Sequence, residues 1–185
     1  MKQWSGLFVL AVAGICGCGV GSVAPLVTGE TLIDEPRLAG TWKGAKESAV
    51  ITPTGPGTFD LTYKDESGKS GQFHARFGRL GSLRILDLEP GDPAPAANDA
   101  YKSLILRAHG IIVVDSVTNV IQFRLLEVDS LKAYLRQNPQ AVAHTLVADA
   151  VLLTASSAET HRFLAAFVQR PHVLSEREEW QRGPR

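Results

Sequence analysis

The chain has 185 residues with 19 basic and 19 acidic side chains, so its formal net charge at neutral pH is zero. This balance argues against nucleic acid and acidic membrane surfaces as partners, because phosphate binding needs a clustered positive excess. Its two cysteines, Cys16 and Cys18, both lie near the N-terminus. The rest of the chain must therefore fold around a hydrophobic core without disulfides.

The first features in chain order are a basic residue and a short apolar run. Lys2 precedes an uncharged segment from Gly6 to Ile15, which is typical of the first two regions of an export signal. The strongly apolar part is only about ten residues long, whereas a membrane span needs about 20. An uncleaved transmembrane anchor is therefore the less favoured alternative.

The apolar run ends in Ile15-Cys16-Gly17-Cys18, which resembles the lipobox of bacterial lipoproteins. The resemblance implies that residues 1–17 are a lipoprotein signal peptide and that Cys18 becomes the lipidated first residue. Two or more acyl chains on one residue give stable membrane anchoring. Because Gly19 follows rather than Asp, the resemblance also implies an outer-membrane location facing the periplasm, if the source has two membranes.

Residues 18–36 are predicted to form a flexible tether. They are rich in Gly, Ser, Thr and Val, show no clear period, and end in Asp34-Glu35-Pro36. A flexible segment of about 17 residues has a root-mean-square span of roughly 20–25 Å. Such a tether would hold a small domain away from a bilayer.

Residues 37–127 are predicted to form an antiparallel β domain, because short runs with period-two alternation are separated by turn residues. The clearest pair is a hairpin of residues 58–64 and 72–77, in which Phe59, Leu61 and Tyr63 share one face. Further strands are expected at 39–45, 47–53, 82–89, 101–108, 111–117 and 120–127. The pattern predicts a mainly β fold with C-terminal helices, in which about eight strands form an up-and-down barrel or a strongly curved sheet.

Residues 128–170 are predicted to form a helical extension packed on the β domain. Asp129 can cap a first helix that Asn138-Pro139 ends, and Ser156 with Glu159 forms a capping-box signature before a second helix. Residues 150–154 are expected to form a strand between them. Residues 171–185 are dominated by Glu and Arg, and we expect this charged tail to fray.

The triplet Gly40-Thr41-Trp42 at the first predicted strand resembles the Gly-x-Trp motif of lipocalins. Arg124, on the last strand before the helices, matches the type and rough place of the arginine that packs over that tryptophan. The resemblance implies that Trp42 and Arg124 are a structural pair that closes the barrel base, and that interior side chains choose the ligand. The general layout also resembles small bacterial lipoproteins with a β-rich body, a comparison that implies no activity.

The sequence carries no recognisable metal or catalytic motif. No two of its five histidines have ligand spacing, and the acidic, Pro-rich stretch from Asp87 to Asp99 lacks the EF-hand order. Neither a Gly-x-Ser-x-Gly elbow nor a Gly-rich phosphate loop occurs. A triad of distant residues, for example a serine with His109 and Asp115, stays open. We expect no cofactor and no metal.

These features favour a non-enzymatic, lipid-anchored protein of the cell envelope that binds a protein partner or a small apolar ligand. It would meet the membrane through its acyl chains and would not bind nucleic acid. One alternative is a lipocalin-like carrier of small molecules. Another is an envelope hydrolase with dispersed catalytic residues.

Overall fold

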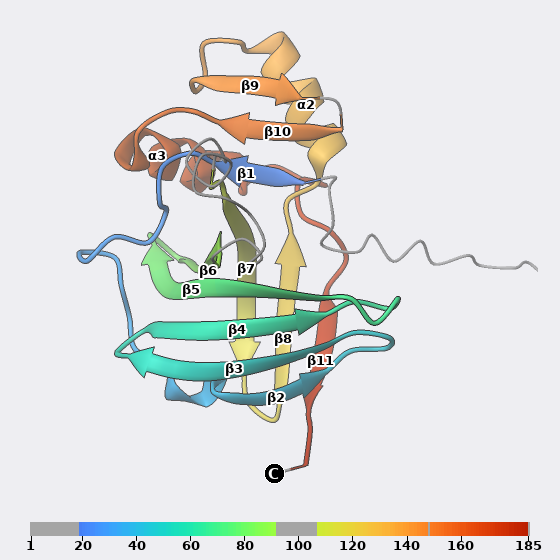
Figure 1. Ribbon diagram of the computed structural model, residues 1–185. Helices are drawn as coiled ribbons and strands as arrows, with labels where there is room; N and C mark the ends of the chain where they lie inside the picture. Colours follow the sequence, from blue (N-terminus) through green and yellow to red (C-terminus); the bar gives the residue numbers. More distant parts are fainter. Residues whose placement is uncertain (1–18, 92–106, 148, 185) are drawn as a thin grey trace, which may run out of the picture.

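The computed structural model describes residues 19–91, 107–147 and 149–184. They fold into a closed antiparallel barrel of eight strands, with three outer strands and two helices at one end (Figure 1). The mainly β fold with C-terminal helices is thus confirmed, and the closed barrel is the form that the predicted sheet takes.

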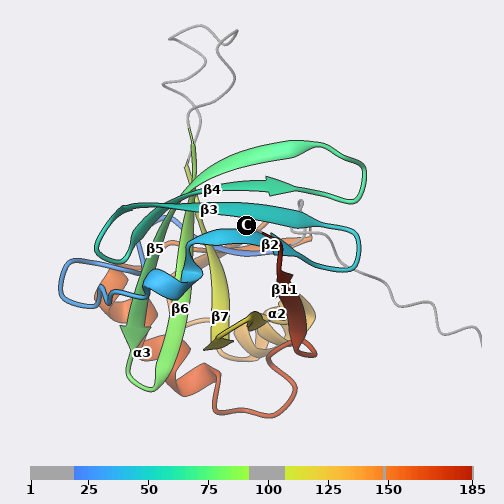
Figure 2. The same cartoon turned by 90° about the horizontal axis from the view of Figure 1, so that it is seen from below.

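The barrel strands follow one another along the chain until the last, so that neighbours in sequence pair with each other. Their bounds are β2 Gly40–Lys43, β3 Ser48–Gly55, β4 Thr58–Lys64, β5 Ser70–Leu80, β6 Leu83–Pro90, β7 His109–Val117, β8 Val120–Leu125 and β11 Glu178–Arg182. The short helix η1, Pro36–Leu38, lies beside β2 (Figure 2). Most of the predicted strand at 101–108 lies outside the described residues.

The hairpin of β4 and β5 confirms the clearest sequence pattern. Leu61 pairs with Phe73, and Tyr63 pairs with Gly71. Phe59, Leu61 and Tyr63 are all buried, as expected for side chains that share the inner face of a strand. Period-two alternation therefore located both the strands and the core-facing side of this hairpin.

The last barrel strand, β11, corrects the prediction of a frayed tail. Glu178–Arg182 pairs with β8 on one side and with β2 on the other, and so closes the barrel. Trp180 is the only apolar residue of this strand, and it is buried against Tyr63 and Phe123 at ring-centroid distances of 6.0 and 5.3 Å. One large aromatic side chain thus anchors a segment whose other residues are polar.

Three outer strands extend the sheet from β7. β1, Val20–Ser22, pairs with β7 and lies parallel to β10, Ala150–Leu153, which pairs in turn with β9, His144–Val147. β10 confirms the strand expected at 150–154, whereas β1 and β9 were not predicted. We call β1, β9, β10 and the two helices the cap.

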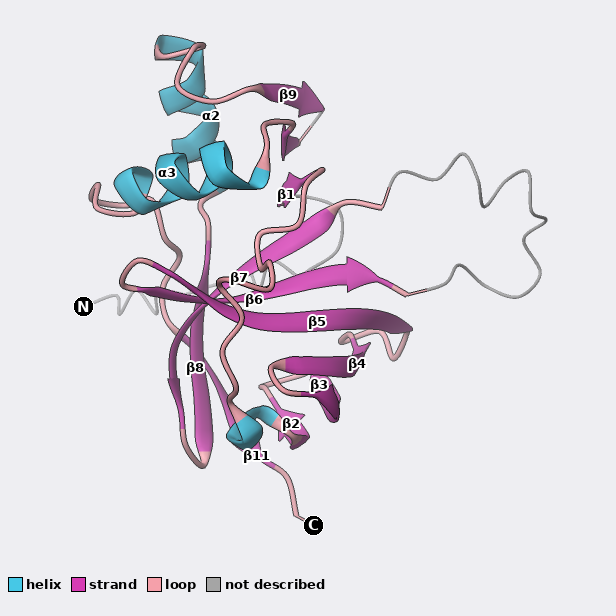
Figure 3. Ribbon diagram, turned by 90° about the vertical axis from the view of Figure 1, so that its left-hand side faces the viewer, coloured by secondary structure: helices cyan, strands magenta, loops and turns pink. Residues whose placement is uncertain are grey.

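The two helices are α2, Val128–Gln137, and α3, Ser157–Phe167, and both lie at the end of the molecule that carries β1 and β9 (Figure 3). Ser156 and Glu159 form the predicted capping box of α3. Asp129 is not the N-cap of α2 but lies in its first turn, where a negative charge still favours the helix dipole. Neither helix of the described chain has the length and apolar character needed to cross a membrane.

The segment before the barrel, expected to be a flexible tether, is part of the fold. Leu26 and Val27 are completely buried, in a core shared by the cap and the outer face of the barrel. The backbone N–H groups of both residues donate to Asp87 Oδ2, at 2.8 and 2.9 Å. Asp87 Oδ1 lies 2.8 Å from His109 Nδ1. Gly78 leaves the room that Val27 occupies, because a Cβ there would lie 2.6 Å from the Val27 side chain.

Removing the Asp87 carboxylate is expected to destabilise the fold. Asp87→Ala leaves two buried N–H groups and His109 without their partner, which should lower the free energy of unfolding by about 2–4 kcal/mol. Asp60 is a matched control, because it pairs with His74 at 2.9 Å while both side chains are 58% exposed. Asp60→Ala should cost about 0.5 kcal/mol or less. Urea denaturation followed by tryptophan fluorescence measures both, and equal losses would contradict the assigned role of Asp87.

Candidate functional site

The interior of the barrel is the first candidate for a binding site. Its lining comes from η1 and from strands β3 to β8 and β11, and none of the described side chains that form it is charged. Leu38, Leu61, Phe123 and Trp180 are among them. The cavity between these side chains measures about 40 Å³, several-fold less than the roughly 300–1,000 Å³ of a typical small-molecule site. The interior is therefore a packed apolar core with a small void.

Trp42 and Arg182 close the base of the barrel. Trp42 is fully buried, and its Nε1 donates a hydrogen bond of 2.8 Å to the carbonyl oxygen of Leu38 in η1. The Arg182 guanidinium carbon lies 4.2 Å from the centre of the Trp42 ring. The same guanidinium donates to the carbonyl oxygens of Ala39 and Arg37, at 2.9 and 2.5 Å. One arginine thus joins the last strand of the barrel to the helix before the first.

Gly40 makes this arrangement possible. Its φ of +140° is a conformation that residues with a side chain rarely adopt. A Cβ at this position would lie 2.5 Å from Arg182 Nη1. The backbone conformation of Gly40 therefore favours glycine in the Gly-x-Trp triplet, and the missing Cβ leaves room for the Arg182 guanidinium.

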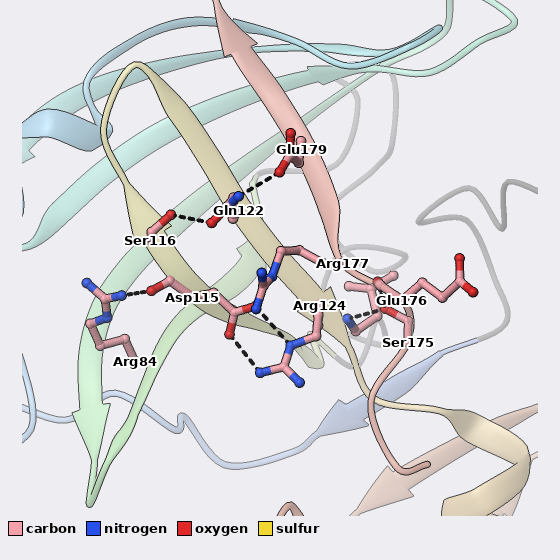
Figure 4. A network of polar contacts seen from close by, with 10 residues as sticks. Arg84, Asp115, Ser116, Gln122, Arg124, Ser175, Glu176, Arg177 and Glu179 are labelled. Atoms are coloured by element: carbon pink, nitrogen blue, oxygen red, sulfur yellow. Dashed lines mark hydrogen bonds and ion pairs between the residues drawn. The ribbon is translucent and has the colours of Figure 1, made fainter. Parts of the chain in front are cut away.

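Arg124, which the lipocalin resemblance places over Trp42, lies elsewhere. It forms two hydrogen bonds of 2.9 and 2.7 Å with the carboxylate of Asp115 (Figure 4). The prediction chose the last strand before the helices, but the barrel ends with β11, whose Arg182 takes the place over the ring. Trp180, two residues before Arg182, is the only apolar mark of this strand in the sequence, and a single apolar residue does not predict a strand.

Asp115 is the centre of a polar network on the outside of the barrel. Arg177 Nε lies 3.0 Å from its Oδ2, and Arg84 donates to its backbone carbonyl oxygen (Figure 4). Burial raises the pKa of Asp115, but the hydrogen bonds from Arg124 and Arg177 outweigh it, so that the pKa lies below its ordinary value. The network therefore joins Arg177, the residue directly before β11, to strands β7 and β8.

A second chain of hydrogen bonds runs across strands β7, β8 and β11. Ser116 Oγ donates to Gln122 Oε1 at 2.8 Å, and Gln122 Nε2 donates to Glu179 Oε1 at 2.6 Å (Figure 4). These outer contacts hold β11 in place from the side opposite to Trp180.

The structure does not bring together His109 and Asp115, the two residues that a dispersed triad would need. His109 pairs with Asp87, while the carboxylate of Asp115 pairs with two arginines. Ser22 lies opposite His109 in the strand register, but it is fully buried and its Oγ donates to the carbonyl oxygen of Ala24 at 2.7 Å. Each of these groups therefore serves a structural contact.

Some sequence candidates lie outside the described residues, among them Cys16, Cys18 and most of the acidic, Pro-rich stretch. His74 is exposed on its strand, as expected, and pairs with Asp60. Within the described parts of the chain, no three His, Cys, Asp or Glu residues gather as metal ligands would.

No protein-family model, curated protein or solved structure matches this chain.

Replacing Arg182 tests the closure of the base. Arg182→Ala removes the contact with Trp42 and two charge-assisted hydrogen bonds, and should lower the free energy of unfolding by about 2–3 kcal/mol. It should also change the near-ultraviolet circular dichroism of the tryptophans. Arg170, which lies 4.6 Å from the ring centre of Tyr134, is the matched control. Arg170→Ala should cost about 1 kcal/mol or less. An equal cost for both variants would argue against a closing role for Arg182.

Proposed function

We propose that the protein is a non-enzymatic, lipid-anchored protein of the bacterial envelope that binds a partner protein at the membrane through its outer surface. The observation that carries this proposal is the filled barrel, whose interior leaves only about 40 Å³. Sites for small molecules usually measure about 300–1,000 Å³. A drug-sized ligand does not fit among these side chains, so recognition is assigned to the outside of the molecule.

The anchoring part of the proposal rests on the lipobox resemblance of Ile15-Cys16-Gly17-Cys18. Acyl chains on Cys18 would keep the body at the membrane for as long as the protein persists. Gly19, in the place where some lipoproteins carry a retaining Asp, supports the outer membrane and its periplasmic side in a bacterium with two membranes.

The non-enzymatic part rests on the contacts of the polar side chains that catalysis could use. His109 and Asp87 hold each other and the backbone of the N-terminal segment. Asp115 is held by Arg124 and Arg177. These groups act as structural links between distant parts of the chain.

A lipocalin-like carrier is the second candidate. It is supported by the closed barrel, by its uncharged lining, and by a base sealed with Trp42 and Arg182. A carrier would have to move side chains of the lining apart to admit an apolar molecule. The two candidates therefore differ in whether the barrel takes up such a molecule.

Native mass spectrometry distinguishes them. The acylated protein, released from membranes in detergent and mixed with palmitic acid, should appear at the mass of the chain with its covalent lipids alone, because its interior is filled. Binding of palmitic acid with a stoichiometry of one would favour the carrier.

A cavity-filling variant gives the control for that experiment. Leu61→Phe adds a few carbon atoms to the lining, which the void of about 40 Å³ can take. Palmitic acid that still binds this variant occupies the outer surface, and the proposal of a packed barrel stands. Loss of bound palmitic acid in a Leu61→Phe variant with unchanged circular dichroism would assign the ligand to the interior and overturn the proposal.

The anchor is tested by a pair of cysteine variants. Cys18→Ala should abolish labelling with radioactive palmitate and release the protein into the soluble envelope fraction, whereas Cys16→Ala should change neither result. Labelling and cell fractionation provide the two measurements. Continued acylation of Cys18→Ala would refute the assignment of the anchored residue.

A further inference from the structure

The cap begins directly after the proposed anchor. Gly19 already belongs to the fold, because its carbonyl oxygen accepts a hydrogen bond of 3.1 Å from the backbone N–H of Val151. Strand β1 starts at the next residue. If Cys18 carries the acyl chains, as the proposed function holds, a single peptide unit of about 3.8 Å separates Cys18 from Gly19. The body then has no spacer between itself and the lipid.

The directions of the strands show which strand ends lie close to Gly19 and therefore close to the lipid. β1 and β10 are parallel and β9 is antiparallel to β10, so the N-terminal ends of β1 and β10 lie beside the C-terminal end of β9 (Figure 1). Val20 pairs with Val151, and Val151 pairs with Leu146. Since neighbouring strands lie about 4.8 Å apart, Leu146 is about 10 Å from Val20 across the sheet.

The strand that follows this attachment is fixed within the body. Only a few residues separate β1 from Leu26 and Val27, which are fully buried and are held by Asp87. The anchor therefore pulls on a strand that is fixed between β7 and β10. The end of the cap that contains Gly19 must therefore stay within reach of the headgroups.

Strand β9, close to Gly19, carries an exposed apolar side chain that could contact lipid. Leu146 is 39% exposed on β9, which is the free edge of the sheet that the described strands form. It is one of three large apolar side chains exposed in the described part of the chain, with Val23 and Val50. From Ala141 to Leu153 the ionisable residues are His144 and Asp149, and the others are small or apolar. Because the Asp149 side chain is exposed beside these apolar residues, this part of the cap is expected to lie at the level of the headgroups and not among the acyl chains.

We propose that the β9–β10 edge of the cap rests on the lipid bilayer, with Leu146 in the interfacial layer. A bilayer is the favoured occupant of this surface because the acylated residue lies one position before Gly19. The body is then held in an orientation in which the cap lies closer to the lipid than the barrel strand β3 does.

Site-specific fluorescent labelling tests this orientation. In the processed protein Cys16 has been removed with the signal peptide and Cys18 is acylated, so a newly introduced cysteine is the only free thiol. Leu146→Cys is the test variant, and Val50→Cys on β3 is the matched control, since Val50 is also an exposed apolar residue. Each is labelled with a polarity-sensitive dye and reconstituted in phosphatidylcholine and phosphatidylglycerol vesicles, with and without nitroxide-labelled lipid.

The dye at position 146 should shift its emission to shorter wavelength and be quenched by the nitroxide lipid several-fold more strongly than the dye at position 50. Equal, weak quenching at both positions in protein that floats with the vesicles would overturn the orientation while leaving the anchor intact. A blue shift at position 146 without quenching would also overturn it, because a protein surface would then cover the edge. Protein that fails to float with the vesicles would refute the anchor itself.

Discussion

The carboxylate of Asp87 is the interaction on which the arrangement of this molecule depends. It is almost completely buried, and a buried charge is tolerated only where hydrogen bonds replace its water. Its partners are two backbone N–H groups of the N-terminal segment and the ring of His109. Because these partners come from distant parts of the chain, one side chain on β6 joins the first described residues to the barrel and makes them a structural part of the cap.

The other end of the chain completes the fold in a similar way. Strand β11 closes the barrel, Trp180 fills its interior, and Arg182 seals its base over Trp42. Outside the barrel, Asp115 and its arginines hold the segment that leads into β11. Both ends of the described chain are thus fixed to the same closed body, whose interior is lined by apolar side chains.

Local patterns in the sequence predicted the local parts of this structure. The alternation around Leu61 gave the hairpin, and Ser156 with Glu159 gave the start of the second helix, because both signals act over a few residues. The integration of Leu26 and Val27 could not be predicted, since Asp87 lies about 60 residues away in sequence and nothing local marks it as their partner. Strand β11 was missed because a single tryptophan among charged residues does not form a period. For the same reason the arginine over Trp42 was assigned to Arg124 instead of Arg182.

If Cys18 carries the proposed acyl chains, no flexible spacer separates the folded body from the membrane, because Gly19 already pairs with Val151. Neutron reflectometry of the acylated protein on a supported bilayer measures the thickness of the water layer between the lipid headgroups and the protein. Protein density should begin at the headgroups, without an intervening water layer. A water layer of roughly 20–25 Å, the span of a flexible tether of this length, would contradict it.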